Sequence, residues 1–192
     1  MMRARLCLMT GLLLTACAEG PASSPVSSAG VVDLDGVITD PLAGSAATVL
    51  LFLSTHCPIS NRYAPTLRAL ADAWAARGVH VWLVYPDPDD DAAAIRAHQT
   101  AYALDLPTLR DPGHLLVARA GVRVTPEAAV FAPAQPTPAY RGRIDDRVQD
   151  FGKIRPEASA HELRDAVDAV LRGEPPRPAP GPAIGCYIAD LR

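Results

Sequence analysis

The chain has 192 residues, a formal net charge of −3 and 49% hydrophobic residues. About 150 residues remain once an N-terminal leader and linker are set aside, which suits one domain with a single core. A slightly acidic chain without a cluster of Lys and Arg lacks the basic surface that nucleic acids require, so no nucleic-acid partner is expected.

The first sixteen residues predict an export signal. Arg3 and Arg5 precede a short apolar run that cannot span a bilayer durably. Leu14-Thr15-Ala16-Cys17 resembles a bacterial lipobox, which implies cleavage before Cys17 and lipidation of that cysteine; an ordinary signal peptide is the alternative. Several acyl chains would anchor the protein to the membrane stably. Because Ala18 rather than aspartate follows, the pattern favours the outer membrane, on the periplasmic side of the cell envelope.

Residues 17–30 are mainly Ala, Ser, Pro and Gly, and they predict a flexible tether. After it, the apolar run of residues 48–53 predicts a buried strand, and residues 61–77 predict a helix that ends at Gly78. Cys57 lies at their junction. There, unpaired N–H groups and the positive end of the helix dipole favour the thiolate, which is the nucleophilic form. A buried, inert cysteine is the alternative interpretation.

The following residues predict further elements in alternation. We expect strands at 79–85, 127–131 and 139–144, a helix that an Asp N-cap starts and that runs to about Tyr102, and a short helix at 115–120. Ser159 and Glu162 form a capping box before an amphipathic closing helix. A parallel βαβ half joined to an antiparallel half predicts an α/β fold over residues 31–172, and residues 31–38 could add an N-terminal hairpin.

Around Cys57 the chain resembles the thioredoxins. Their active site reads Cys-Gly-Pro-Cys and, three residues later, Ala-Pro-x-Leu. Cys57, Ala64-Pro65 and Leu67 stand in the same register, with Ser60 in place of the second cysteine. The resemblance implies a thioredoxin-like three-layer sandwich, a central mixed β-sheet with helices on both faces. It also implies that Cys57 is catalytic and that no disulfide forms at position 60, where Ser60 is expected to modulate the thiolate.

A second resemblance lies at Thr125-Pro126, just before the predicted strand at 127–131. Thioredoxin-like proteins carry a cis-proline here, packed against the active cysteine; an ordinary trans turn is the alternative. A cis bond implies that the Thr125 backbone lies beside Cys57 and can pair with an extended partner segment. Ser54 also matches the peroxiredoxin pattern, although Leu50 replaces its proline. Residues 48–171 therefore resemble the redoxin branch, which comprises alkyl hydroperoxide reductase and thiol-specific antioxidant proteins.

The exported domain would keep two thiols, because Cys7 leaves with the signal and Cys17 takes the lipid. Cys186 follows five prolines in residues 174–182, so residues 173–192 predict a stiff arm that advances about 3 Å per residue. This arm is either a tail whose Ile184 and Ile188 patch the surface, or the means by which Cys186 returns to Cys57, as a resolving thiol or a second metal ligand.

Three functions follow as hypotheses. The first is a thiol oxidoreductase without a cofactor, in which Cys57 attacks a protein disulfide or a small peroxide and an external reductant restores the thiols. His56 would modulate the thiolate. The main rival is a copper-binding protein that uses Cys57, Cys186 and one histidine, a soft ligand set suited to Cu(I). The third is a non-catalytic adaptor that binds peptides, with the charged loop at 145–153 as a rim.

Overall fold

The computed structural model describes residues 31–179, 181–189 and 191. Its central feature is a six-stranded mixed sheet in the order β1-β4-β3-β2-β6-β7. The predicted signal peptide, the tether and the lipidation site Cys17 lie outside the described residues. Among the residues described, no helix combines the length and apolar character needed to cross a membrane.

The sheet is built around β2 (Ala47–Phe52), in which every residue is buried. It runs parallel to β3 (Val79–Tyr85) and antiparallel to β6 (Glu127–Phe131). Outside these, β4 (Thr108–Arg110) pairs parallel with β3, β7 (Tyr140–Gly142) pairs antiparallel with β6, and β1 (Val32–Asp33) pairs antiparallel with β4. A strand buried on both faces carries a continuous apolar run, which explains why β2 can be predicted from the sequence.

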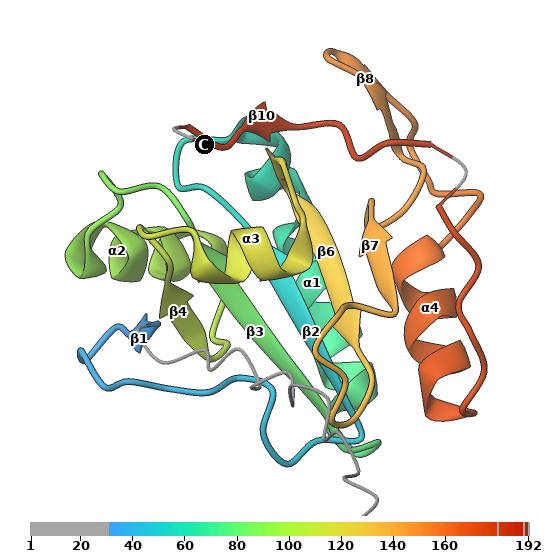
Figure 1. Ribbon diagram of the computed structural model, residues 1–192. Helices are drawn as coiled ribbons and strands as arrows, with labels where there is room; N and C mark the ends of the chain where they lie inside the picture. The colour runs from blue at the N-terminus through green and yellow to red at the C-terminus, as the bar shows by residue number, and fades with distance from the viewer. Residues whose placement is uncertain (1–30, 180, 190, 192) are drawn as a thin grey trace, which may run out of the picture.

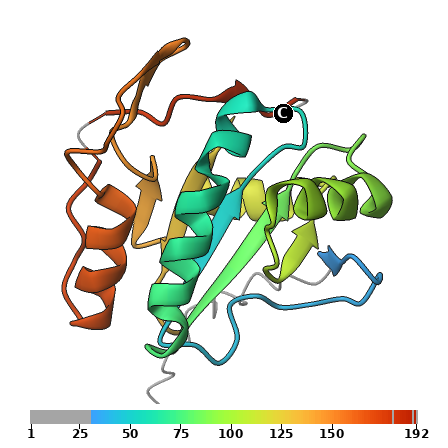
Figure 2. The same cartoon turned by 180° about the vertical axis from the view of Figure 1, so that it is seen from behind.

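Helices cover both faces of this sheet (Figures 1 and 2). Alternate residues of β2 serve the two cores: Val49 and Leu51 pack in one, and Leu50 and Phe52 pack in the other. The first core is closed by α1 (Pro58–Ala75), α2 (Ala92–Tyr102) and α4 (Glu162–Leu171), and the second by α3 (Leu115–Ala120). The predicted three-layer thioredoxin-like sandwich is confirmed.

Several predicted boundaries were wrong. Helix α1 begins at Pro58 rather than Asn61, because proline is tolerated in the first turn of a helix, and it ends at Ala75. The capping box is absent, since α4 begins after His161. Ser159 instead donates to the Asp146 carboxylate, and Glu162 pairs with Arg143. The buried Asp146 and the half-buried Arg143 thus bind the two side chains that the local pattern assigned to the cap.

The strands that the sequence did not predict are short. Besides β4, they are β5 (Val124–Thr125), β8 (Val148–Asp150), β9 (Lys153–Ile154) and β10 (Cys186–Tyr187). The β8–β9 hairpin occupies the charged segment expected to be a loop, and β7 is shorter than the predicted strand at 139–144. The N-terminal hairpin is confirmed in minimal form by a bridge between Val32 and Ile38.

Candidate active site

Cys57 lies where the chain leaves β2 and enters α1, as its N-cap residue in an extended conformation. Its carbonyl accepts the first helical bond from the Asn61 amide, 3.1 Å away. The Sγ atom therefore lies beside the first turn of an 18-residue helix, where free N–H groups and the helix dipole favour a negative charge. The predicted junction position of Cys57 is confirmed.

Thr125 and Pro126 lie directly against this thiol. The peptide bond between them is cis, as the resemblance implied. The Cys57 thiol donates a hydrogen bond to the Thr125 carbonyl over 3.0 Å, and only 1% of the Cys57 surface is exposed. The cysteine, the threonine backbone and the proline therefore form one buried group.

The C-terminal arm returns to the same place. Strand β10 pairs antiparallel with β5, so that Cys186 stands opposite Thr125 and Tyr187 opposite Val124 (Figure 1). The Ile188 amide continues the pairing with a bond to the Arg123 carbonyl. Cys186 thus lies beside Cys57, and both thiols are free. Both interpretations of the arm had its apolar residues packing on the domain, and the structure adds that Cys186 returns to Cys57.

The two thiols differ sharply in acidity. Burial raises the pKa of the Cys57 thiol, but hydrogen bonds from the Cys186 thiol and from Ser60 outweigh burial, so that the pKa is lowered overall. For Cys186, burial first and then its bond and repulsion with the Cys57 thiolate raise the pKa to about 11. Of the two thiols, Cys57 is therefore the one that loses its proton first, and in doing so it gives up its hydrogen bond to the Thr125 carbonyl.

Ser60, in the position of the second thioredoxin cysteine, is fully buried. Its Oγ atom has no oxygen or nitrogen partner among the described residues, while both its backbone amide and its hydroxyl stabilise the Cys57 thiolate. A buried hydroxyl that lacks a hydrogen-bond partner favours ionisation of a neighbouring thiol, because the thiolate can accept its hydrogen bond. Ser60 is therefore placed beside Cys57, and the modulating role expected of it stays a prediction.

His56 takes a different position from the one expected of a modulating group. Its side chain is 80% exposed, and its Nε2 atom lies 3.9 Å from the buried Asp90 carboxylate. Asp90 also accepts bonds from the amide and hydroxyl of Thr55, which fixes the turn before Cys57. The sequence did not reveal that Asp90 holds this turn, because an acidic run before a helix ordinarily predicts only a solvated N-cap.

The copper hypothesis needs a third ligand beside the two thiols. Over residues 31–179, 181–189 and 191, no group of three or more His, Cys, Asp or Glu side chains is arranged to hold a metal ion. The most buried histidine, His98, is instead bonded to Tyr85 and Asn61. Among the described residues, Cys57, Cys186 and a histidine are therefore not gathered into one ligand set.

Taken together, the mixed sheet, the cysteine at the β2–α1 junction and the adjoining cis-proline define a thioredoxin-like protein. Residues 31–140 match the family model described as AhpC/TSA family. This match spans more than half of the chain, so the protein belongs to the AhpC/TSA family. The resemblance to the redoxin branch is confirmed.

Solved structures agree with this fold. A hypothetical protein from Sinorhizobium meliloti 1021 is similar with 24% identity and a TM-score of 0.67, over 87% of this chain and 94% of that chain. An uncharacterized conserved protein from Geobacillus kaustophilus shows 22% identity and a TM-score of 0.64, over 88% and 93%. A thioredoxin-like protein from Aeropyrum pernix shows 16% identity and a TM-score of 0.52, over 74% and 87%. No match to a curated protein was found.

Proposed function

We propose that this chain is an exported thiol-dependent oxidoreductase in which Cys57 is the nucleophile and Cys186 the resolving thiol. The observation that carries the proposal is the pairing of β10 with β5, which brings Cys186 to Cys57. Membership of the AhpC/TSA family supports thiol chemistry as its general class. Protein disulfides are the proposed substrates, with small peroxides second because Ser54 keeps part of the peroxiredoxin pattern.

The reaction has two steps. The Cys57 thiolate attacks one sulfur of the substrate disulfide; a new S–S bond forms, the substrate bond breaks, and the departing sulfur takes up a proton. Cys186 then loses its proton and attacks the Cys57 sulfur, which releases the second substrate thiol and leaves a Cys57–Cys186 disulfide. The substrate gains two electrons and the pair of protein thiols loses them. An external thiol reductant returns the pair to its starting state.

The electrostatics support this order. Two of the three causes that raise the pKa of Cys186 are its hydrogen bond to Cys57 and the charge of the Cys57 thiolate. Both disappear once Cys57 is bound to a substrate sulfur, because that sulfur carries no charge. The pKa of Cys186 then falls, and the second thiolate forms only when it is needed. With a peroxide, Cys57 becomes a sulfenic acid, and condensation with Cys186 releases water.

The experiment that tests the proposal counts thiols. A disulfide oxidant added to the reduced full-length domain should convert the thiols of Cys57 and Cys186 into one intramolecular bond, which dithiothreitol reverses. Cys57→Ser should abolish this conversion, because it removes the nucleophile. Intact-mass measurement after alkylation gives the count, and the same assay with hydrogen peroxide ranks the second substrate. The proposal would be refuted if the wild-type protein kept both free thiols after treatment with the oxidant.

Export and lipid anchoring belong to the same proposal. They rest on Leu14-Thr15-Ala16-Cys17 at the end of the short apolar run. Mass spectrometry of the membrane fraction should find a mature N-terminus at Cys17 that carries acyl chains. An unmodified N-terminus at any other residue would contradict the anchor without touching the thiol chemistry.

A further inference from the structure

The last strand of the chain, β10, covers the nucleophile. The arm leaves Cys57 with 1% of its surface exposed, and β10 fills the edge of β5 next to Pro126. An edge of this kind recognises extended polypeptides through backbone bonds. Any substrate strand that uses β5 must therefore replace β10, and β10 shows which sequence fits there.

Gly185, directly before the resolving cysteine, makes the closest approach. A Cβ atom at this position would lie 2.1 Å from the Thr125 oxygen, 2.6 Å from its carbonyl carbon and 3.0 Å from the Pro126 nitrogen. All three are backbone atoms that hold the active site together, so they cannot move aside cheaply. Only glycine fits immediately before a cysteine that is placed opposite Thr125.

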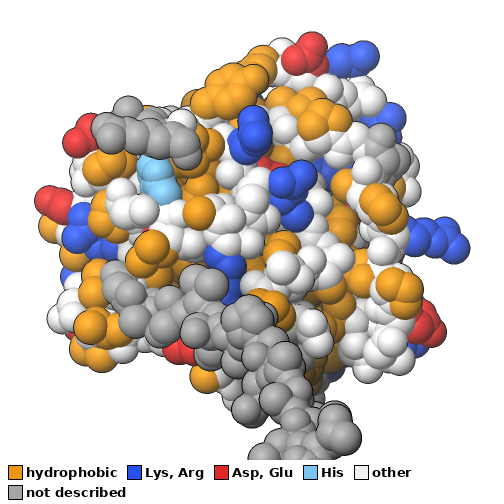
Figure 3. All heavy atoms as spheres, in the orientation of Figure 1, with side chains coloured by type: hydrophobic (Ala, Val, Ile, Leu, Met, Phe, Trp, Pro, Cys, Tyr) orange, Lys and Arg blue, Asp and Glu red, His pale blue; other side chains and the backbone are white. Residues whose placement is uncertain are grey.

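The neighbouring positions have different requirements. Ile188 is 7% exposed in the core beneath α3, and Ile184 packs against the core on the α1 side. Tyr187 is 85% exposed, so its position does not require an apolar residue. Hydrophobic side chains gather along the edge of the molecule where β10 lies (Figure 3). The segment that fits β5 is therefore an apolar residue, glycine, cysteine, any residue and a second apolar residue.

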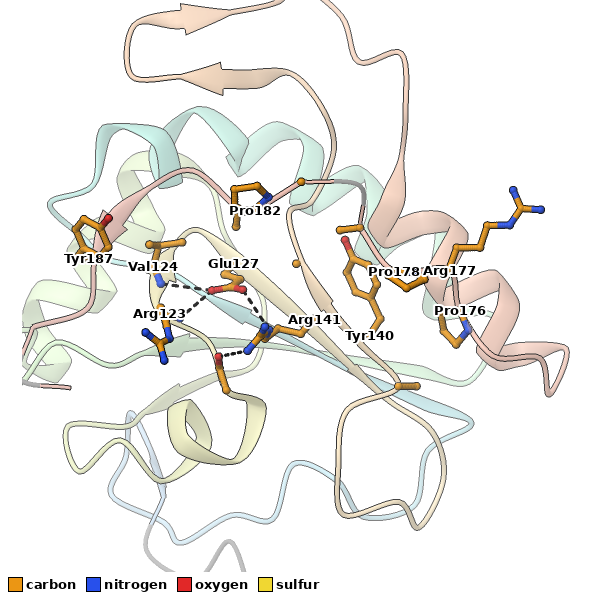
Figure 4. Close-up of a pocket in the computed structure, with 16 residues that line it drawn as sticks. Arg123, Val124, Glu127, Tyr140, Arg141, Pro176, Arg177, Pro178, Pro182 and Tyr187 are labelled. Carbon is orange, nitrogen blue, oxygen red and sulfur yellow. Dashed lines mark hydrogen bonds and ion pairs between the residues drawn. The ribbon is translucent and has the colours of Figure 1, made fainter. Parts of the chain in front are cut away.

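Among the described residues of the arm from 174 to 183, none is fully buried. Residues 176–179 and 181–183 run along a cavity of about 660 Å³, whose opposite wall includes β7 and the Glu127–Arg141 pair (Figure 4). Ala179 crosses β7 at Gly142, where a Cβ would lie 2.9 Å from it. A segment with few packed contacts opens locally at low cost. Detachment of β10 thus requires the release of two strand residues and the two isoleucines, while the sheet stays intact.

We propose that β10 is an internal competitor at the edge of β5, where the backbone before the cis-proline can pair with the disulfide substrate; this rests on the function proposed above. The substrate strand, with glycine before its reactive cysteine, displaces β10 and presents that cysteine's sulfur to Cys57. The Cys57–substrate bond forms as the substrate disulfide breaks and its partner sulfur takes a proton. The return of β10 then removes the substrate strand from β5 and delivers Cys186 to the mixed disulfide, so that strand exchange and disulfide exchange occur together.

The test uses the reduced full-length domain with Cys186→Ser and two peptides. One has the sequence of residues 183–188, and the other has its glycine replaced by alanine; each cysteine carries a coloured aromatic thiol as a mixed disulfide. Release of the dye reports attack on the peptide sulfur. The glycine peptide should react with Cys57 about tenfold faster or more, while both should react equally with free glutathione.

Equal rates for the two peptides would overturn the inference, and so would reaction of Cys57 with a small aromatic disulfide but with neither peptide. In both cases the proposed function would stand. Failure of Cys57 to react with any disulfide would instead refute the proposed function.

A second measurement uses the chain's own strand. Gly185→Ala should lift β10 from β5 and speed alkylation of Cys57 by iodoacetamide about tenfold or more. Gly181→Ala is the matched control, because its Cβ would lie 3.5 Å from Arg143 Nη1 in ordinary contact. The control should alkylate at the wild-type rate. An unchanged rate in Gly185→Ala would show that β10 does not cover the nucleophile and would overturn the competitor role.

Discussion

Full-length protein with Cys186→Ser should stop after the first chemical step. It keeps the helix terminus and the stabilising bonds from Ser60, and the new serine hydroxyl can donate in place of the Cys186 thiol, so the attack on a disulfide persists. The second step is lost, because no other free cysteine among the described residues stands beside Cys57. Release of substrate from Cys57 should slow by about a hundredfold or more, since an intramolecular thiol is replaced by one from solution.

Acid quenching and then intact-mass measurement detect the trapped intermediate directly. The variant should accumulate a Cys57 mixed disulfide that the wild type clears. Tyr187→Ala is the matched control, because the side chain is 85% exposed on the same strand and should leave resolution at the wild-type rate. Equally fast clearance by Cys186→Ser would remove Cys186 from the mechanism.

Much of the fold was predictable because its central elements are self-sufficient in the sequence. Strand β2 is buried throughout and is nearly all apolar, β3 is apolar except at the exposed His80, and α4 carries apolar residues at helical spacing. The two-residue strands β5 and β10 are too short to show any period. They form because the arm packs against the active site, which depends on tertiary contacts and not on the local sequence. The resemblance to thioredoxin correctly placed Pro126, but nothing in the sequence pairs Thr125 with Cys186.

For the candidate site, the sequence predicted where Cys57 and Pro126 lie in the fold, but it did not predict the contacts between the residues. A cysteine between an apolar run and a helix indicates a nucleophile, and a stiff proline-rich arm indicates that the cysteine at its end can reach a distant part of the domain. Gly185 was missed, although a glycine next to a functional cysteine is a usable signal for close backbone approach. His56 was expected to act on Cys57, but its ring lies near Asp90, whose burial depends on the folding of the loop between β3 and α2.

Cys57 and Cys186 should titrate far apart. The pKa of Cys57 is lowered by Cys186 and Ser60 against the effect of burial, whereas that of Cys186 is raised to about 11. A thiol with a lowered pKa loses its proton at lower pH, so alkylation of Cys57 should reach its midpoint below the free-thiol value of ~8.5. Alkylation of Cys186 should still be rising more than about two pH units above that midpoint, which is over a hundredfold in thiolate fraction at neutral pH.

Site-resolved mass spectrometry of the alkylated wild-type protein gives both curves. Restricted access to the buried Cys57 slows its alkylation at every pH, but the midpoint of the curve still follows the pKa of the thiol, so the order of the two midpoints remains diagnostic. Cys57→Ser separates the causes, because the pKa of Cys186 should then fall as the thiolate's charge and hydrogen bond are lost. Coincident midpoints near ~8.5 in the wild type would mean that the thiols do not interact. An unchanged Cys186 midpoint in Cys57→Ser would show that burial alone sets its pKa, and Cys186 would then have no electrostatic reason to wait for Cys57 to react.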